Sequence, residues 1–218
     1  MFPKKSFSQN FLTDESIVER ITKEGMSDGC EYVIEIGAGE GALTAELAKA
    51  SPHVIAIELD RDLIPSLRRR FPSDSNVSLV EGDILRMDIA ETLRKYGWSE
   101  GQPYTIFGNI PYGITGQIIR KIIEIDPAPR KAVLMVQKEV AERIAEKNKK
   151  TSLISLAVSL WGNGNILFSV PKAAFFPIPR VESAILELLP NPNRREHASR
   201  ERIIRLAKIG FASKRKTL

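Results

Sequence analysis

The sequence contains few of the residues that build disulfides and metal sites. Its 218 residues include one cysteine, Cys30, and two histidines, His53 and His197. A lone cysteine cannot form an internal disulfide, and neither histidine stands at the spacing of metal ligands. We therefore expect no metal centre and read His53 as a surface or strand-edge residue.

Long hydrophobic runs are also missing. Apolar runs such as residues 132–136 are far too short to cross a bilayer, and no segment recurs with a period of 20 to 50 residues. The first twenty residues carry six charged side chains where a secretory signal would have an apolar core. These absences argue against a membrane or repeat protein and, with the lone cysteine, predict a cytoplasmic location.

The charge is unevenly distributed along the chain. The net charge is +5, from 32 Lys and Arg and 27 Asp and Glu. Residues 194–218 hold nine basic and two acidic residues, a net charge of +7, so the preceding chain is close to neutral at −2. A cationic segment on a neutral domain is typical of contact with a polyanion, although a solvated helix at a chain end has the same composition.

Apolar runs rich in Val and Ile alternate with segments of helical periodicity from about residue 31 to residue 189. This pattern predicts an α/β fold with a largely parallel sheet. We expect strands at residues 32–36, 54–59, 77–80, 104–107 and 132–136, and a closing antiparallel pair at 166–170 and 184–189. We expect helices at residues 42–50, 63–70, 114–125 and 138–146, and one from Ser199 to about Gly210 after a linker at 190–193.

A glycine-rich loop follows the first predicted strand. Gly37, Gly39 and Gly41 have the spacing G-x-G-x-G, not the G-x-G-x-x-G of dinucleotide enzymes, and the chain has no NTP-binding P-loop. Glu35 and Glu40 would repel a pyrophosphate. A cofactor with adenosine but no phosphate fits better, and S-adenosylmethionine is such a cofactor. An NAD-dependent oxidoreductase shares the fold class and remains an alternative.

Two further acidic residues follow the next predicted strands. Glu58 ends the second strand 21 positions after Gly37, where a carboxylate can accept hydrogen bonds from ribose hydroxyls. Asp83 follows the third strand and can accept from an adenine amino group, although Gly82-Asp83 is also an ordinary turn. The carboxyl ends of parallel strands form the edge at which open α/β sheets bind ligands, so these groups are expected to converge.

The tetrapeptide Asn109-Ile110-Pro111-Tyr112 follows the fourth predicted strand. It resembles the motif of enzymes that methylate exocyclic amino groups, in the N-[LI]-P-Y form used on adenine N6. That amine is a poor nucleophile because its lone pair is delocalised into the ring. The Asn109 side-chain oxygen and the Ile110 carbonyl can accept its two hydrogens, which favours a pyramidal nitrogen aimed at the methyl group. Pro111 fixes the turn, and Tyr112 can stack on an extruded base.

The whole chain resembles the ribosomal RNA adenine dimethyltransferases. Its motifs occur in the family's order: Lys5-Ser6-Phe7-Ser8-Gln9-Asn10-Phe11-Leu12, the glycine loop from Glu35, the Asn109 tetrapeptide, residues 137–141, residues 175–184 and residues 214–218. The resemblance implies a Rossmann-like class I methyltransferase with a mostly parallel seven-stranded sheet. It also implies methyl transfer from S-adenosylmethionine to N6 of adenosine in ribosomal RNA.

The resemblance further implies roles for single residues. Tyr112 and Phe175 would bracket the target adenine, and residues 1–12 would fold over cofactor and RNA as a lid. The cofactor site would comprise Gln9, Asn10, Leu12, Gly37, Gly39, Glu58, Asp83 and Asn109. We expect RNA contacts at Lys147, Lys149, Lys150, Arg180, Lys214, Arg215 and Lys216.

Two branches of the family compete. The small-subunit (KsgA) type dimethylates two adjacent adenosines in the 3′-terminal hairpin of 16S rRNA, whereas the Erm type modifies one adenosine in 23S rRNA and confers macrolide resistance. Residues 137–143 and 214–218 resemble the first type. Ser8 in place of the usual Gly, and residues 107–112 followed by residues 118–122, are closer to the second. We favour the small-subunit type. We expect the protein to act as a monomer on a small-subunit precursor and to bind no membrane.

Both branches continue into a small helical domain at the point where this sequence ends. We therefore expect a catalytic domain at residues 1–190, followed at 191–218 by a linker and the basic first helix of a truncated RNA-binding domain. A non-catalytic RNA-binding assembly factor is a further alternative. Such a protein would be expected to have lost Asn109 or Tyr112, and both are present.

Overall fold

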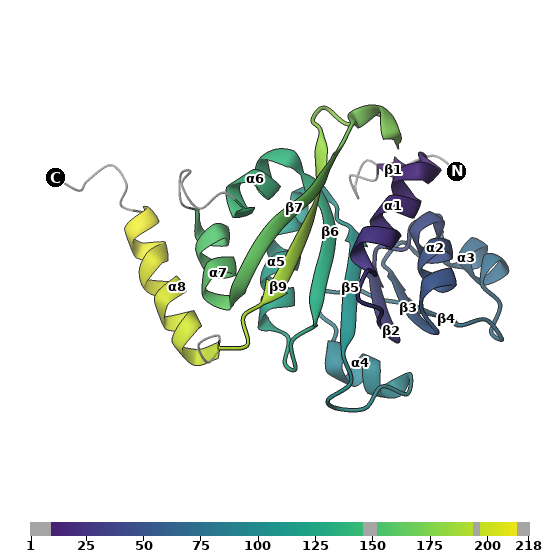
Figure 1. Cartoon of the computed structure of the whole chain (residues 1–218), viewed down its shortest axis with the longest axis horizontal. Coiled ribbons are helices and arrows are strands. Elements are labelled where there is room, and N and C mark those ends of the chain that lie inside the picture. Colours follow the sequence, from purple (N-terminus) through teal and green to yellow (C-terminus); the bar gives the residue numbers. More distant parts are fainter. Residues whose placement is uncertain (1–9, 146–151, 194–196, 213–218) are drawn as a thin grey trace.

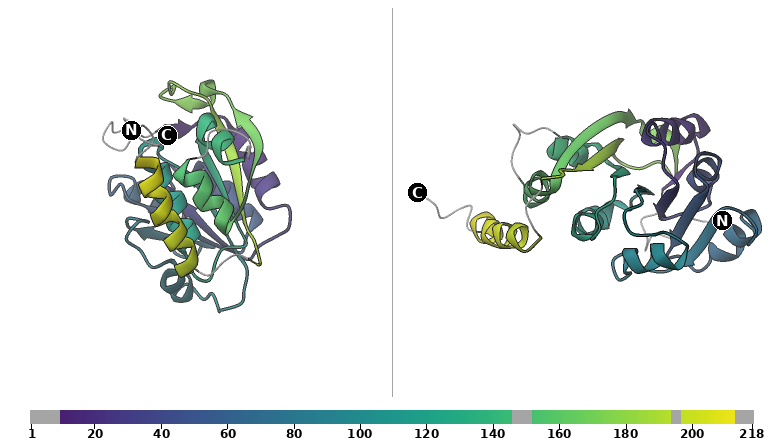
Figure 2. Two further views of the ribbon diagram at one scale, coloured as in Figure 1. Left: turned by 90° about the vertical axis from the view of Figure 1, so that its left-hand side faces the viewer. Right: turned by 60° about the horizontal axis from the view of Figure 1, so that its bottom comes forward.

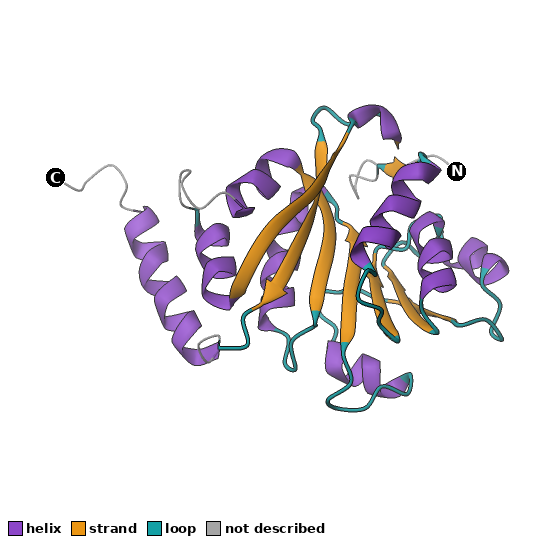
Figure 3. Cartoon of the chain, in the orientation of Figure 1, coloured by secondary structure: helices purple, strands orange, loops and turns teal. Residues whose placement is uncertain are grey.

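The computed structural model describes residues 10–145, 152–193 and 197–212. Within these residues the chain forms a seven-stranded sheet with helices on both faces (Figures 1 and 3). The strand order is β4-β3-β2-β5-β6-β9-β7. The strands are β2 (Tyr32–Ile36), β3 (His53–Glu58), β4 (Val77–Glu81), β5 (Tyr104–Asn109), β6 (Lys131–Gln137), β7 (Gly162–Val170) and β9 (Ser183–Pro190).

The sheet is parallel from β4 to β6 and antiparallel beyond it. β2 pairs in parallel with both β3 and β5, whereas β9 runs antiparallel to β6 and β7. The chain moves outward from β2 to β3 and β4 and then returns to the other side of β2 as β5. This reversal of strand order creates a crevice at the carboxyl ends of β2 and β5. The predicted α/β fold with a mostly parallel seven-stranded sheet is thus confirmed.

Two hydrophobic clusters bury the two faces of the sheet. Val33 packs with α1, α2 and α3 on one face, and Ile34 packs with α4, α5 and α7 on the other, as the alternation of side chains along a strand requires. β2 is buried along its whole length. The helices are α1 (Glu15–Gly25), α2 (Ala42–Ala50), α3 (Ile64–Arg70), α4 (Ile89–Lys95), α5 (Thr115–Glu124), α6 (Lys138–Ala145), α7 (Leu153–Trp161) and α8 (His197–Ala212).

The structure also contains elements that the sequence patterns did not predict. The helices α1, α4 and α7 were missed, although each begins at a residue whose side chain caps it: Asp14, Asp88 and Ser152. The two-residue strands β1 (Phe11–Leu12) and β8 (Phe175–Phe176) pair with each other. No local pattern predicts a pairing between segments more than 160 positions apart.

Most predicted elements are confirmed with small changes at their ends. The largest change is in β7, which begins at Gly162 instead of residue 166. His53 is exposed at the start of β3, which confirms its place at a strand edge. α8 lies at one end of the molecule beside α7 (Figures 1 and 2). Among the described helices, none is both long and apolar enough to cross a membrane.

Candidate active site

A cavity of about 350 Å³ opens at the carboxyl ends of the parallel strands. Its lining comes from the ends of β2, β3 and β5, the turn after β4, and the N-terminal segment beside β1. It brings together residues predicted for cofactor binding and for catalysis: Asn10, Gly37, Gly39, Glu58, Asp83, Asn109, Ile110, Pro111 and Tyr112. The convergence that the sequence predicted is therefore present in the fold.

The glycine loop leaves β2 through backbone conformations that favour glycine. Gly37 and Gly39 have φ angles of 76° and 58°. The Gly39 amide donates to Glu58 Oε2 at 2.8 Å, and the Asp60 amide donates to Glu58 Oε1 at 2.7 Å. Glu58 thus fixes the loop against the end of β3. Because each carboxylate oxygen can accept more than one hydrogen bond, Glu58 can still bind ribose hydroxyls.

Glu35, two residues before the loop, is buried in the centre of the sheet. Burial raises the pKa of its carboxyl from 4.5 to about 8, the nearby Glu58 adds to the rise, and Thr44 opposes it. Its Oε2 has no hydrogen-bond partner within the described residues. Glu35 lines a smaller cavity, about 60 Å³, that shares Gly37 and Asn109 with the larger one.

Both cavities are acidic. Glu35, Glu40, Glu58 and Asp83 line them, and no Lys, Arg or His among the described residues does. The acidic side chains of Glu40, Glu58 and Asp83 suit a ligand with positive charge and no phosphate, whereas the raised pKa of Glu35 keeps that carboxyl protonated near neutral pH. S-adenosylmethionine meets both conditions, because it carries a sulfonium and an ammonium group.

Asp83 stands at the turn after β4. Its Oδ1 accepts a hydrogen bond from the Leu85 amide at 3.0 Å, and its Oδ2 lies 3.5 Å from Arg86 Nε. The Gly82 amide donates to the Glu58 carbonyl at 2.9 Å, which ties this turn to the end of β3. Glu58 and Asp83 therefore occupy neighbouring positions along one wall of the cavity.

Asn109 ends β5 and begins the tetrapeptide. Its Nδ2 donates to the Asn10 carbonyl at 3.1 Å, so Oδ1 remains as an acceptor. The Ile110 amide donates to the Met135 carbonyl at 3.1 Å, which anchors the turn on β6. Side chain and backbone are thus both fixed before any ligand is bound.

Tyr112 starts a short 3₁₀ helix at Tyr112–Ile114. Its hydroxyl lies 2.9 Å from Ser183 Oγ at the start of β9. Burial raises the pKa of the Tyr112 phenol, and the hydrogen bond with Ser183 partly opposes the rise. Sequence reasoning gave Ser183 no role, although it lies in the family motif at 175–184. Ser183 orients the ring that was predicted to stack on the target base.

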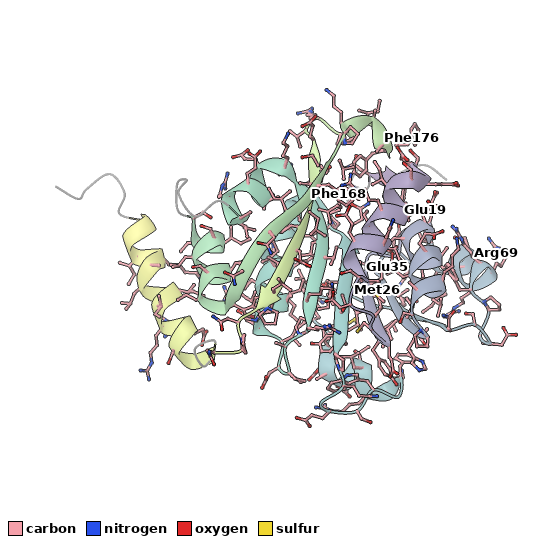
Figure 4. All side chains as sticks on the ribbon, viewed as in Figure 1. Glu19, Met26, Glu35, Arg69, Phe168 and Phe176 are labelled. Atoms are coloured by element: carbon pink, nitrogen blue, oxygen red, sulfur yellow. The ribbon has the colours of Figure 1, made fainter. Side chains whose placement is uncertain are left out.

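Two residues predicted for this site lie outside its main cavity. Leu12 pairs with Phe175 across β1 and β8 and lines the smaller cavity. Phe175 is only 2% exposed and belongs to the core cluster on the α1 side of the sheet, and its contact with adenine stays a prediction. The next residue along the strand, Phe176, points outward and is 61% exposed (Figure 4). Side chains alternate between the faces of a strand, so the two rings point in opposite directions.

The predicted RNA contacts are only partly described. Arg180 is exposed on the loop between β8 and β9. The other predicted contacts, and Gln9 of the cofactor site, lie outside the described residues: Lys147, Lys149, Lys150, Lys214, Arg215 and Lys216. In the part of the chain that the structure describes, no group of three His, Cys, Asp or Glu side chains could hold a metal ion.

The sequence and the fold were compared with known proteins. The family model described as ribosomal RNA adenine dimethylase matches residues 3–218. The ribosomal RNA small subunit methyltransferase A of Dehalococcoides mccartyi strain CBDB1 is 37% identical over 216 residues, which cover 99% of this chain and 72% of that protein. The protein of the same name from Streptococcus uberis is 39% identical over 218 residues, covering 99% and 75%.

Solved structures share the fold. The 23S rRNA methyltransferase ErmE has a TM-score of 0.76 and 27% identity, with 95% of this chain and 81% of that chain covered. A dimethyladenosine transferase from Plasmodium falciparum has a TM-score of 0.73 and 28% identity, with coverage of 95% and 73%. The cavity, its acidic lining and these similarities agree, and the chain belongs to the ribosomal RNA adenine dimethylases, a family of methyltransferases that use S-adenosylmethionine.

Proposed function

We propose that this protein dimethylates N6 of two adjacent adenosines in the 3′-terminal hairpin of small-subunit ribosomal RNA. The names of the relatives at 37% and 39% identity support the small-subunit substrate. The observation that carries the chemistry is the fixed Asn109 side chain. Its Nδ2 is held by the Asn10 carbonyl, so its Oδ1 can accept a hydrogen bond from the adenine amino group.

The residues around Asn109 act by positioning and not by strong base catalysis. Asn109 Oδ1 and the Ile110 carbonyl accept the two amino hydrogens, which favours a pyramidal nitrogen whose lone pair is less delocalised into the ring and points at the methyl group. Tyr112, held by Ser183, supports the face of the base. Bound S-adenosylmethionine supplies an electrophilic methyl group. No residue must remove a proton in advance, because the nitrogen can lose its proton after the methyl group has been transferred.

The proposal also covers the oligomeric state, the location and the domain roles of the protein. We expect the protein to act as a monomer on a small-subunit precursor in the cytoplasm, where ribosomes are assembled. Residues 1–190 would form the catalytic domain, and the basic segment 191–218 would contact RNA. The chain spans 72% and 75% of the length of the two bacterial relatives described above.

Identification of the methylated nucleoside tests the proposal. The protein is incubated with radiolabelled S-adenosylmethionine and either undermethylated small subunits or protein-free 23S rRNA, and the RNA is then digested. We expect labelled dimethyladenosine from the small-subunit RNA. Label in 23S rRNA alone would replace the proposal by the Erm-type reaction. Cofactor binding without label in either RNA would favour the non-catalytic assembly factor.

A further inference from the structure

Three large apolar side chains are exposed at the end of β8 and on the loop that follows it, beside the candidate active site. Phe176, Ile178 and Val181 are 61%, 65% and 43% exposed, and we call these three residues the platform. Phe176 lies at the upper edge of the molecule in Figure 4. Exposed apolar side chains that gather in one place mark a surface that another molecule covers.

Hydrogen bonds hold the platform next to the reacting groups. Phe176 is paired with Phe11 across β8 and β1, and Phe11 itself lines the cavity. The residue before it, Asn10, accepts the hydrogen bond from Asn109 Nδ2. On the other side of the platform, Ser183 holds the Tyr112 hydroxyl at 2.9 Å. The platform is therefore linked at both of its ends to the two side chains that would bind the target adenine.

The charges around the platform favour an anionic partner. Arg180 is exposed on the loop after β8, Lys172 is exposed on the short 3₁₀ helix before β8, and Arg180 makes no ion pair with any described residue. The acidic residue of the loop, Glu182, lies 2.8 Å from Lys138 Nζ, and this hydrogen bond lowers the pKa of its carboxyl. The negative charge of Glu182 is thus paired, whereas the charge of Arg180 is available.

Exposed apolar side chains among cations are typical of surfaces that bind single-stranded nucleic acid, because bases stack on the side chains while phosphates contact the cations. An enzyme that takes a base out of its stack leaves the neighbouring base without a stacking partner. We propose that the platform binds the nucleotide next to the target adenosine, with Phe176 stacked on its base and Arg180 at its phosphate. This inference rests on the proposed function, because it requires an RNA substrate.

Kinetics of platform variants on undermethylated small subunits test the inference. We expect Phe176→Ser to raise KM for the RNA substrate roughly tenfold, within the range that base stacking supplies, with kcat and cofactor affinity unchanged. Phe176→Trp retains an aromatic face and should restore KM. Arg180→Glu should also raise KM, whereas Arg94→Glu, the same charge change on an exposed residue of α4 at the opposite end of the strands, should not.

Binding to synthetic RNA hairpins identifies the contacted nucleotide. An abasic residue beside the target adenosine should weaken binding by the wild-type protein and leave binding by Phe176→Ser unchanged. If Phe176→Ser and wild type have equal KM values, the platform does not bind RNA and the inference is wrong. The proposed function still holds in that case, provided that the wild type methylates small-subunit RNA. The inference would also be wrong if Phe176→Ser lost binding to small subunits but bound the RNA hairpin as wild type does. The platform would then contact a ribosomal protein and not the RNA. If the wild type methylates no ribosomal RNA, the proposed function itself fails.

Discussion

The Asn109 side chain has two roles. Its Nδ2 donates a hydrogen bond to the Asn10 carbonyl, and its Oδ1 is proposed to accept a hydrogen bond from the substrate amine. We predict that Asn109→Ala lowers the rate of methyl transfer at least about 100-fold, the usual cost of removing a group that stabilises a transition state. Cofactor affinity should fall far less, because Glu58 and Asp83 remain. Single-turnover methylation and calorimetric titration of the cofactor separate the two effects.

The control for this variant is Asn163→Ala, which removes an exposed amide on β7 far along the sheet from the cavity. It should leave both the methylation rate and cofactor affinity at wild-type values. Near-normal turnover by Asn109→Ala would show that the proposed positioning mechanism is wrong.

Glu35 makes the stability of the fold depend on pH. Its carboxyl has a pKa of about 8 in the folded protein, mainly because of burial, and about 4.5 in the unfolded chain. Between these values the folded state binds a proton that the unfolded state has released, so the free energy of unfolding falls as pH rises from about 5 to about 8. We predict that Glu35→Gln removes this decline and is more stable than wild type at pH 8.5, by at least about 1 kcal/mol.

Urea unfolding of both proteins at several pH values between 5 and 9 measures the effect. Glu40→Gln is the matched control, because Glu40 lies in the same loop but is exposed, and its curve should follow that of wild type. Parallel curves for wild type and Glu35→Gln would mean that Glu35 is ionised in the folded protein throughout this range.

At the scale of elements, the pairing of β1 with β8 places Phe11 against the glycine loop. Phe11 lines both cavities, and its ring would lie 3.5 Å from a Cβ atom placed on Gly39. We predict that Phe11→Ala raises the dissociation constant of S-adenosylmethionine about tenfold, because the variant lacks an apolar wall of the cavity. Phe11→Leu keeps most of that wall and should bind the cofactor almost as wild type does. Equal affinity for all three proteins would show that β1 does not contact the cofactor.

At the scale of the whole molecule, the uneven charge predicts how RNA binding responds to salt. Residues 194–218 carry a net charge of +7 against −2 for the remainder. We predict that Arg215→Glu with Lys216→Glu weakens RNA binding and flattens the plot of log affinity against log salt, by nearly one unit of slope for each phosphate that the variant no longer neutralises. Arg94→Glu with Lys95→Glu changes the net charge equally and should leave the slope unchanged. If both pairs give the wild-type slope, the tail makes no phosphate contact.

Most of the sheet, and the convergence of the candidate cofactor residues on one cavity, could be predicted because their signals are local. A buried parallel strand is a continuous apolar run, and strand ends are marked by the residues that follow, as at Gly37, Glu58 and Asn109. The sequence patterns did not predict α1, α4 and α7, although Asp14, Asp88 and Ser152 provide capping side chains, because α4 and α7 are only seven and nine residues long and a cap by itself also fits an ordinary turn. Family resemblance added the N-terminal segment, for which composition gave no signal.

The amino-acid sequence was enough to predict the fold class and the cofactor class, and it led to the chemistry proposed for Asn109-Ile110-Pro111-Tyr112, since each depends on neighbouring residues or on fixed spacing along one strand and turn. Tertiary structure decided which of Phe175 and Phe176 is buried and that Glu35 lacks a hydrogen-bond partner for Oε2 within the described chain. It also decided that Ser183 holds Tyr112 and that Asn10 holds Asn109. These contacts join residues that are 71 and 99 positions apart in the sequence. Such residues meet only when the sheet has formed and brought its strand ends together.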